Sequence, residues 1–327
     1  MRDQPDSKRF GLIGTITLDH ISAHSGRSFV GLGGVLYQAA ALCGLGEEVS
    51  LYSLCGRYLQ EDLEKTVAGW TTLRRKGIVY VAGPGNQVRL HYPAQGERRE
   101  VLESVVPPLK AMDILPDLGR FNMLLLVLNS GFDIELPEWR AVVAAASSPI
   151  WLDVHSLALF PATGIHRYYR PLPEWTRWAE GVTYLQANLQ EVACMLGRPE
   201  RFPDGRELEA FARQAFDVGV EAVFVTLGKE GVRTLTPGTS RKVPARDVGA
   251  PLDSTGCGDI FCAGAMSLLA RRIAPLRAAS FGVSLASLGV TVSGVAETFR
   301  LTSELGAARL RAARSKSSRG RKHEPHA

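Results

Sequence analysis

Short apolar runs that alternate with helix-like segments are the feature that most constrains the fold of this chain. MLLLVLN at residues 123–129 and AVFVTLG at residues 222–228 are examples of such runs. Strands that are apolar on both faces are typical of a parallel sheet that helices cover on both sides. The alternation therefore predicts an α/β protein with a largely parallel central sheet.

Two segments depart from this pattern. Residues 16–30 and 78–102 carry alternating polar residues with Gly and Pro punctuation. Such a pattern indicates exposed hairpins rather than core strands. We expect the two segments to form a small β lid over one edge of the sheet, within a core domain that spans residues 8–313.

The positive charge of the chain is concentrated at one end. The formal net charge is +5, but residues 306–327 hold seven Arg or Lys residues against one acid, so the rest of the chain is close to neutral. The charge therefore does not imply a surface that binds nucleic acid. We expect residues 314–327 to form a basic, disordered tail because they lack apolar residues to bury.

Cysteine use and hydropathy point to the compartment. The five cysteines are scattered and form no CxxC pair, as is typical of buried thiols in a reducing environment. The N-terminus is polar, and the longest apolar run, residues 123–128, is too short to span a bilayer. We expect a soluble, cytoplasmic protein without a membrane partner.

A glycine-rich turn leads directly into an apolar segment at residues 253–266, DSTGCGDIFCAGAM. The residues after Gly258 predict a buried helix that begins at the GCG turn. Such a helix start presents unpaired N–H groups and partial positive charge, which would stabilise an anion. Asp259 could then be the base for a hydroxyl that attacks a phosphoryl group held there. The alternative is that Asp259 only caps the helix.

A second carboxylate attracts interest because of its position. Asp153 ends the buried run IWLDV, and ligand sites of α/β proteins collect at the carboxyl ends of strands. His155 follows two residues later and is expected to be a hydrogen-bonded structural histidine rather than a ligand.

The turn at residues 253–259, DSTGCGD, resembles the D-T-x-G-A-G-D signature of the ribokinase-like, or phosphofructokinase-B (PfkB), carbohydrate kinases. Three further matches keep the family's order: Gly33-Gly34 before AAALCGLG, Asn188–Glu191 as N-x-x-E, and Thr226–Gly231 as T-x-G-x-x-G. The resemblance spans about residues 10–300, and four ordered motifs are a more specific signal than any one of them. It implies a ribokinase-like three-layer α/β/α sandwich with a mostly parallel central sheet and a small β lid.

The resemblance also implies residue roles around ATP. Asp259 would be the catalytic base, and the amides of Gly256, Cys257 and Gly258 would form the anion hole. Asn188 and Glu191 would hold Mg²⁺ through water, a task for hard oxygen ligands; otherwise they are a helix cap and a first-turn acid. The remaining nucleotide contacts would come from Thr226, Gly228, Gly231 and Thr255.

On the acceptor side the resemblance implies an acid from the first strand, the glycine pair, and groups from the lid. The candidates are Asp19, Gly33, Gly34, Tyr37, Arg89, Tyr92 and Asp153. A plain solvent-facing strand is the alternative for Arg89 and Tyr92. The resemblance leaves open a homodimer through the lid and a requirement for a monovalent cation such as K⁺.

Two departures from the family pattern fall on the acceptor side. In the helix after the glycine pair the family has Asn, and counting from either end of the motif places Tyr37 or Gln38 there. Tyr58 stands where the family has Asp. An altered acceptor pocket beside intact nucleotide motifs indicates an acceptor other than plain ribose or fructose. We expect an ATP-dependent kinase that phosphorylates a hydroxyl of a small carbohydrate or carbohydrate-like molecule.

Two alternatives remain: a nucleoside kinase of the same fold, and a non-catalytic sensor that binds sugar or nucleotide. A Walker loop, a G-x-G-x-x-G dinucleotide motif and a G-x-S-x-G elbow are all missing from the sequence, which disfavours the corresponding enzyme classes.

Overall fold

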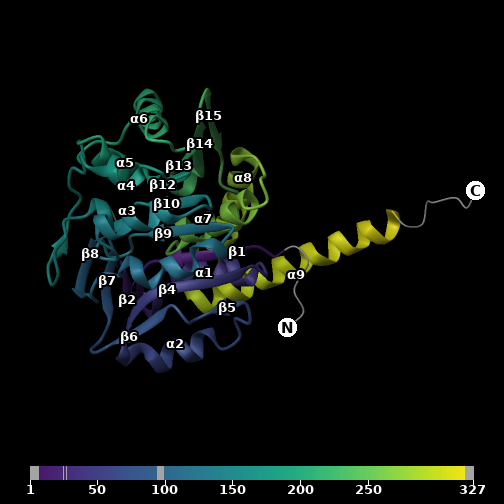
Figure 1. Cartoon of the computed structure of the whole chain (residues 1–327), viewed down its shortest axis with the longest axis horizontal. Helices are drawn as coiled ribbons and strands as arrows, with labels where there is room; N and C mark the ends of the chain where they lie inside the picture. Colours follow the sequence, from purple (N-terminus) through teal and green to yellow (C-terminus); the bar gives the residue numbers. More distant parts are fainter. Residues whose placement is uncertain (1–6, 25, 27, 94–98, 321–327) are drawn as a thin grey trace, which may run out of the picture.

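The computed structural model describes residues 7–24, 26, 28–93 and 99–320 (Figure 1). Ten strands form one sheet, in the order β15-β14-β13-β12-β10-β9-β1-β4-β5, with β6 paired to β4. All of its pairings are parallel except those of β13 with β14 and of β14 with β15. The strands are β1 (Arg9–Ile13), β4 (Glu48–Gly56), β5 (Leu73–Arg74), β6 (Ile78–Val81), β9 (Met123–Val127), β10 (Ile150–Asp153), β12 (Tyr184–Asn188), β13 (Ala222–Thr226), β14 (Val232–Thr236) and β15 (Thr239–Val243).

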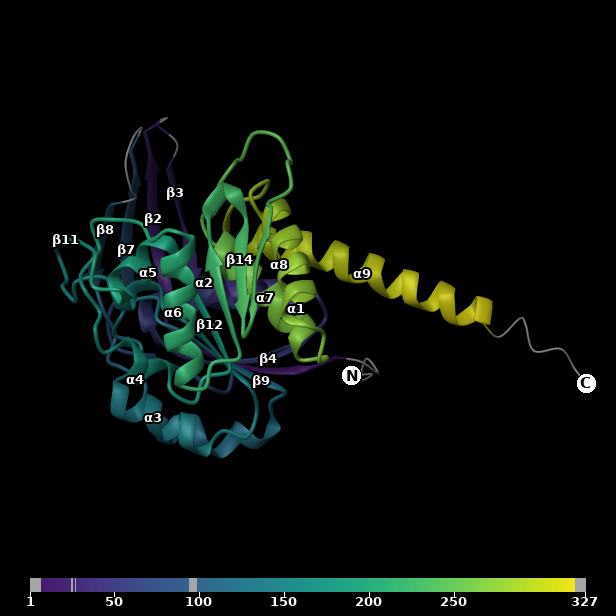
Figure 2. The ribbon, with the colours of Figure 1, turned by 90° about the horizontal axis from the view of Figure 1, so that it is seen from above.

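Helices cover both faces of this sheet, which gives the predicted three layers. Figure 2 shows α6 on one side of β12 and β14, and α7 and α8 on the other. One layer contains α1 (Leu36–Gly44), α7 (Cys257–Leu269), α8 (Pro275–Gly289) and α9 (Gly294–Gly320); the other contains α3 (Leu136–Ala145), α4 (Trp175–Ala179), α5 (Leu189–Met195) and α6 (Gly205–Asp217). A further helix, α2 (Gln60–Val67), packs near α9.

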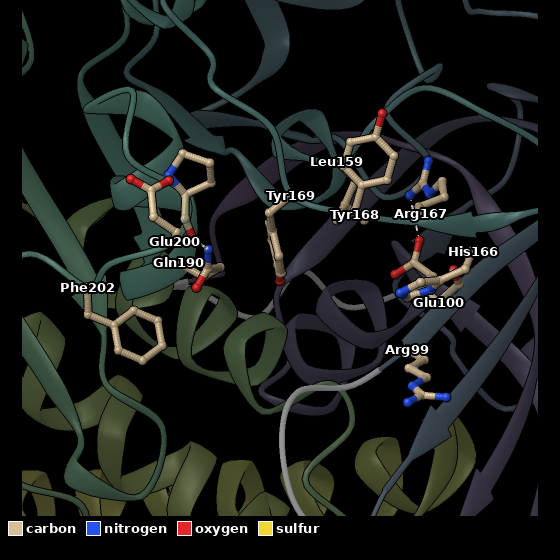
Figure 3. Close-up of a pocket in the computed structure, with 11 residues that line it drawn as sticks. Arg99, Glu100, Leu159, His166, Arg167, Tyr168, Tyr169, Gln190, Glu200 and Phe202 are labelled. Carbon is tan, nitrogen blue, oxygen red and sulfur yellow. Dashed lines mark hydrogen bonds and ion pairs between the residues drawn. The ribbon is translucent and has the colours of Figure 1, made fainter.

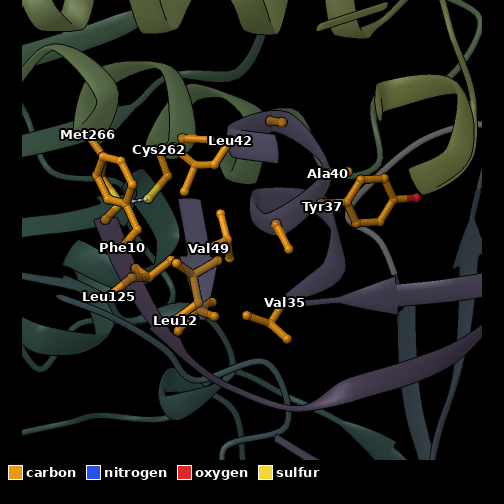
Figure 4. Close-up of a cluster of buried hydrophobic side chains, with 14 of the residues drawn as sticks. Phe10, Leu12, Val35, Tyr37, Ala40, Leu42, Val49, Leu125, Cys262 and Met266 are labelled. Carbon is orange, nitrogen blue, oxygen red and sulfur yellow. Dashed lines mark hydrogen bonds between the residues drawn. The ribbon is translucent and has the colours of Figure 1, made fainter. Parts of the chain in front are cut away.

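The apolar runs divide their side chains between these two layers. In β9, Met123 and Leu125 join one core cluster, whereas Leu124 and Leu126 join the other. This period of two is the reason that a buried parallel strand reads as a continuous apolar run. Figure 4 shows the first cluster, where Phe10, Leu12 and Leu125 of the sheet face Leu42 of α1 and Met266 of α7.

A second sheet of five strands forms the lid, in the order β11-β8-β7-β2-β3. Its strands are β2 (Ile16–Ala23), β3 (Ser28–Gly34), β7 (Asn86–Tyr92), β8 (Arg99–Ser104) and β11 (His166–Arg167). The β-rich segments predicted from the sequence are therefore present, and the parallel pairing of β2 with β7 joins them. The expected lid boundary at residue 78 is wrong, because β6 pairs with β4 of the main sheet.

The chain changes sheets between β1 and β2. The apolar run GLIGTITL reads as one strand, but β1 ends at Ile13 and β2 begins at Ile16. The buried carboxylate of Asp133 holds this crossing, since the Thr15 N–H and hydroxyl both donate to Oδ1, at 3.0 and 2.6 Å. The first lid strand, β2, therefore follows directly after β1, a central strand of the main sheet.

The C-terminal helix α9 reaches Gly320, beyond the domain boundary at residue 313 that we expected from the sequence. Residues 321–327 of the expected tail lie outside the described residues. Over the part of the chain that the structure describes, no helix is both long enough and apolar enough to cross a membrane.

Candidate active site

The carboxyl ends of three parallel strands meet beside the start of α7. In register, Asp153 at the end of β10 lies opposite Gln186 of β12, and Asn188 at the end of β12 lies opposite Thr226 of β13. This edge is where open α/β sheets place their ligands.

Three hollows adjoin along this edge. A small inner cavity of about 50 Å³ lies under the lid, and its lining includes Asp19, Tyr37, Gly256 and Asp259. A central cleft of about 530 Å³ contains Asp153, Asn188, Glu191 and the turn at residues 254–259. An outer groove of about 800 Å³ extends from Thr226, Gly228 and Gly231 to the other side of α7.

The turn at residues 253–258 is held in place by two polar contacts. Asp253 accepts from the Thr255 N–H at 2.8 Å and from the Ser293 hydroxyl at 2.7 Å. Gly256 adopts the left-handed conformation with φ of 77°, and a Cβ there would overlap the Tyr37 ring. Glycine is therefore required at this position by both backbone and space.

The first helical bond of α7 runs from the Ile260 N–H to the Gly256 carbonyl at 2.8 Å. The N–H groups of Cys257 and Gly258 precede it, in the first turn, where the amides of an α-helix have no intrahelical partner. Cys257 N also lies 3.3 Å from the Ser254 carbonyl. The helix start thus presents the amides and the positive dipole end that stabilise an anion.

Asp259 lies in the first turn of α7 and is 8% exposed. Its Oδ1 accepts a hydrogen bond from Gln38 Nε2, and Gln38 is fully buried on α1. Because Asp259 lines both the inner cavity and the central cleft, its carboxylate faces two chambers. A helix-capping side chain would not need that position.

The sequence left open whether Tyr37 or Gln38 takes the position of the family's Asn in the helix after the glycine pair. In the structure both residues face the site. Gln38 contacts Asp259, whereas Tyr37 lines the inner cavity. Burial, with the nearby Asp19, Asp253 and Asp259 carboxylates, raises the pKa of Tyr37 well above its usual range. Its hydroxyl therefore keeps its proton at neutral pH.

The glycine pair on β3 leaves space for Asp19, the acid on the lid strand β2. Asp19 is buried, and a Cβ on Gly33 would overlap its Oδ2 atom. Gly33 thus makes room for Asp19, while Gly34, with φ of 64°, itself lines the inner cavity.

The two candidates on the lid strand β7, Arg89 and Tyr92, differ in where their side chains lie. Arg89 points outward, is 63% exposed and pairs with Glu103 at 2.5 Å, so the structure does not bring it to the site. Its neighbours Val88 and Leu90 line the inner cavity instead. Tyr92 reaches the turn, where its hydroxyl lies 3.1 Å from Thr255 Oγ1. Tyr58 is 75% exposed and lines none of the three hollows.

Asn188 and Glu191 form a capping box at the start of α5. The Glu191 N–H donates to Asn188 Oδ1 at 2.8 Å, and the Asn188 N–H donates to Glu191 Oε2 at 2.8 Å. Burial, together with the nearby Glu191 carboxylate, raises the pKa of Asp153 well above the usual range of a carboxyl. Gln186 Nε2 donates to Asp153 Oδ2 at 2.9 Å and to the Gly258 carbonyl at 3.2 Å.

This pair of buried carboxylates fits a divalent cation better than it fits an empty site, since a hard cation would relieve their repulsion. Within the described residues no group of three or more His, Cys, Asp or Glu side chains is arranged to hold a metal. A cation here would therefore take its other ligands from water and phosphate, as Mg²⁺ commonly does.

The structure adds several residues that the sequence reasoning did not select. They are Thr17, Glu100, Asn129 and Gln186, and each lines the inner cavity or the central cleft. Asn129 directly follows the apolar run of β9, so its place at the end of a buried strand was the available signal. His155, with φ of 40°, lies at both hollows.

Comparison with known proteins gives a family match over part of the chain and a fold for most of it. Residues 162–301 match the family described as pfkB family carbohydrate kinase. No curated protein matches the chain.

Solved structures match at low identity. Ribokinase of Arabidopsis thaliana, complexed with ribose and ATP, is 17% identical with a TM-score of 0.70 over 92% of this chain and 99% of that one. A nucleoside kinase of Burkholderia thailandensis, in complex with inosine, is 17% identical with a TM-score of 0.72 over 93% and 97%. A pyrophosphate-dependent kinase in the ribokinase family, complexed with a pyrophosphate analog and myo-inositol, is 13% identical with a TM-score of 0.69 over 88% and 96%. The resemblance found in the sequence is confirmed: residues 162–301 match the PfkB carbohydrate kinases, and the chain as a whole has the ribokinase fold.

Proposed function

We propose that this protein is an ATP-dependent kinase that transfers the γ-phosphoryl group to a hydroxyl of a small carbohydrate-like acceptor. The observation that carries the proposal is the position of the turn at residues 256–259. Gly256 and Asp259 line the inner cavity and the central cleft, while Cys257 and Gly258 line the cleft and the outer groove. One short segment thus lies between the inner cavity, where the acceptor would bind, and the outer groove, where the donor would bind.

In the proposed reaction, Asp259 takes the proton from the acceptor hydroxyl as its oxygen forms a bond to the γ-phosphorus. The bond from the γ-phosphorus to the β–γ bridging oxygen breaks, and ADP leaves with that electron pair. Gln38 orients the Asp259 carboxylate through its hydrogen bond to Oδ1. The amides at the start of α7 stabilise the charge on the phosphoryl oxygens.

The outer groove supports a nucleotide as donor. It has a volume of about 800 Å³, and Val248, Phe261, Val283 and Val290 give it an apolar wall. A purine ring would bury apolar surface there, whereas pyrophosphate has none to bury. We therefore expect ATP to be used in preference to pyrophosphate.

Asp153 and Glu191 would hold Mg²⁺ through water next to the donor phosphates, with Asn188 keeping Glu191 in place. When bound, the ion would offset phosphate charge. The capping box orients Glu191 whether or not an ion is bound, since both of its hydrogen bonds are internal to α5 and its cap.

The test is Asp259→Asn, measured as acceptor-dependent ADP release with ATP and Mg²⁺ and as ATP affinity by calorimetry. We expect kcat to fall by about a hundredfold or more, because the base is lost, while ATP affinity changes little. Asp62→Asn on the exposed surface of α2 is the matched control and should behave as the unmodified protein. Near-normal turnover of Asp259→Asn would contradict the proposed base.

A sensor that binds without turnover is the competing function. It predicts binding of acceptor and ATP with no product formed by the unmodified protein. Mass spectrometry of the acceptor after incubation with ATP distinguishes the two functions directly, because a phosphorylated product appears only if the protein is a kinase.

A further inference from the structure

The central cleft and the inner cavity contain no Lys or Arg among their described lining residues. Both contain carboxylates instead: Asp19 and Glu100 in the cavity, Asp153 and Glu191 in the cleft, and Asp259 in both. Sites that transfer a phosphoryl group commonly use a cationic side chain as a hydrogen-bond donor to its oxygens. The place where the reaction would occur therefore requires a different side-chain donor.

The cationic side chains of the surrounding hollows lie elsewhere. Lys229 and Arg246 line the outer groove, on the donor side. Arg167 is buried and lines a neighbouring pocket of about 620 Å³, where Figure 3 shows it beside Glu100. Its guanidinium pairs with Glu100 at 2.5 Å and donates to the Ser130 carbonyl at 2.6 Å. These contacts hold Arg167 outside the cavity and the cleft.

His155 is one of four residues that line both the inner cavity and the central cleft. The other three, Thr255, Gly256 and Asp259, belong to the turn before α7 and its first turn. His155 comes from a different element, the segment that follows β10. Among the described residues that line the two hollows, it has the sole side chain with a basic nitrogen. It thus lines the place where hydroxyl, base and phosphoryl group would meet.

The backbone of His155 is held in a conformation that few residues adopt. Its φ is 40°, and in the described part of the chain Arg272, with φ of 59°, is the other non-glycine residue with a positive φ. The Asp153 carboxylate accepts a hydrogen bond from the His155 N–H, and the next residue, Ser156, donates its N–H to the Leu128 carbonyl at 3.0 Å. Such conformations persist where the surrounding contacts impose them, and they cluster at functional sites.

One ring nitrogen of His155 has a structural contact. Nδ1 lies 3.0 Å from Ser156 Oγ, which is the kind of hydrogen bond expected of a structural histidine. When the Ser156 hydroxyl donates to Nδ1, Nε2 carries the ring proton and is a donor. An imidazole with this arrangement donates from Nε2 whether it is neutral or charged, so the role does not depend on titration of the ring.

We propose that His155 is a catalytic residue whose Nε2–H donates a hydrogen bond to a non-bridging oxygen of the phosphoryl group during its transfer. The amides at the start of α7 and His155 would then contact that group from separate elements. No proton leaves the ring, and the constrained backbone positions the donor before the charge develops. The proposal rests on the kinase function proposed above, and it adds a residue to which the family resemblance gives no role.

The first test uses ADP with Mg²⁺ and aluminium fluoride, a mimic of a phosphoryl group in transfer, as the binding probe for the full-length protein. Calorimetry compares its affinity with that of ADP and Mg²⁺ alone. Glycine suits a positive φ, so His155→Gly removes the imidazole without new backbone strain. We expect the gain in affinity from aluminium fluoride to fall about tenfold or more, as for loss of a hydrogen bond to a charged group. The affinity for ADP alone should stay unchanged.

Turnover provides the second readout. A panel of sugars, sugar acids and nucleosides is incubated with ATP and Mg²⁺, and phosphorylated product is measured by mass spectrometry. For any acceptor that gives product, kcat of His155→Gly should fall about a hundredfold, as for removal of one oxyanion-hole donor. KM for ATP should change little, because the contact strengthens only during transfer.

Arg272→Gly is the matched control, because it places glycine at the other positive-φ position. Arg272 follows α7 and is not among the described residues that line the three hollows. The substitution should leave the affinity for ADP with aluminium fluoride and kcat unchanged.

Two further variants identify the nitrogen that acts. The amide nitrogen of His155→Gln reaches about as far as Nε2, whereas that of His155→Asn reaches about as far as Nδ1. We expect His155→Gln to retain more of the aluminium fluoride affinity and of kcat than His155→Asn. The opposite order would overturn the assignment to Nε2. The same comparison decides the matter if His155→Gly does not fold.

The two readouts separate this proposal from the kinase function. Product from the panel, with kcat and aluminium fluoride affinity unchanged in His155→Gly, would overturn the role of His155 and leave the kinase function standing. Loss of aluminium fluoride affinity in His155→Gly, with no product from the unmodified protein, would support the contact and contradict the kinase function. A rise in KM for the acceptor alone would place His155 on the acceptor and overturn the proposal. Equal affinity of the unmodified protein for ADP with and without aluminium fluoride would also overturn it.

Discussion

Cys257 lies between the two glycines of the turn. Its backbone amide, and not its thiol, belongs to the proposed anion hole. Burial, with Asp253 and Asp259 nearby, raises the pKa of Cys257 to about 12. The thiol is therefore neutral at physiological pH and adds no negative charge beside the donor phosphates. Its Sγ lies 3.8 Å from the Ala286 carbonyl, on the side of the outer groove.

We therefore expect Cys257→Ala to retain activity, because the substitution keeps the amide and a small side chain. The change in kcat should be far smaller than the loss of about a hundredfold or more that follows removal of an oxyanion-hole donor. Steady-state kinetics with ATP and Mg²⁺ check this expectation. A large loss of kcat in Cys257→Ala would show that the thiol itself takes part.

At the scale of elements, the lid contacts the turn before α7 through Tyr92, whose hydroxyl lies 3.1 Å from Thr255 Oγ1. The strand β7 that carries Tyr92 alternates its side chains, so Val88 and Leu90 face inward while Arg89 faces solvent. Tyr92 therefore couples the position of the lid to the turn that would hold the phosphoryl group.

Tyr92→Phe should raise KM for the acceptor by about two- to tenfold, the effect expected from one hydrogen bond of ordinary strength. The free energy of unfolding should change little because the aromatic ring remains. Arg89→Ala on the same strand is the control and should leave KM unchanged, since Arg89 is exposed and pairs with Glu103 on the outer face. Equal effects of the two substitutions on KM would argue against a specific role for Tyr92.

At the scale of the whole molecule, the fold brings Asp153 at the end of β10 close to Glu191 of α5, and both residues are buried. Burial and the Glu191 carboxylate raise the pKa of Asp153. A carboxyl with a folded-state pKa above its unfolded value stabilises the fold when protonated. That contribution is lost as the pH rises from about 4 through the raised pKa.

Asp153→Asn should therefore stabilise the protein against unfolding at pH 8 and have a smaller effect at pH 5. Its side-chain oxygen can still accept the hydrogen bond from Gln186. Denaturant unfolding at the two pH values checks the sign, with Asp217→Asn on the exposed end of α6 as the control. Added Mg²⁺ should stabilise the unmodified protein more than the variant. A variant less stable at pH 8 than at pH 5, relative to the unmodified protein, would contradict the sign.

Much of the fold could be predicted from local patterns. A strand buried on both faces must be apolar throughout, so β9 and β13 were recognisable from composition alone, as was the apolar helix α7 after its glycine turn. The break between β1 and β2 could not be predicted, because it depends on Asp133, more than a hundred residues away in the sequence.

The sequence by itself determined the layered α/β architecture, the anion-stabilising helix start and the acid that follows it, because these depend on near neighbours in the chain. Only the tertiary structure decided which of Tyr37 and Gln38 serves which purpose, that Arg89 points away, and that Thr17 and Asn129 share one cavity. Side chains from separate elements meet only through the packing of sheet, helix and lid, and a linear pattern carries no record of the direction in which each one points.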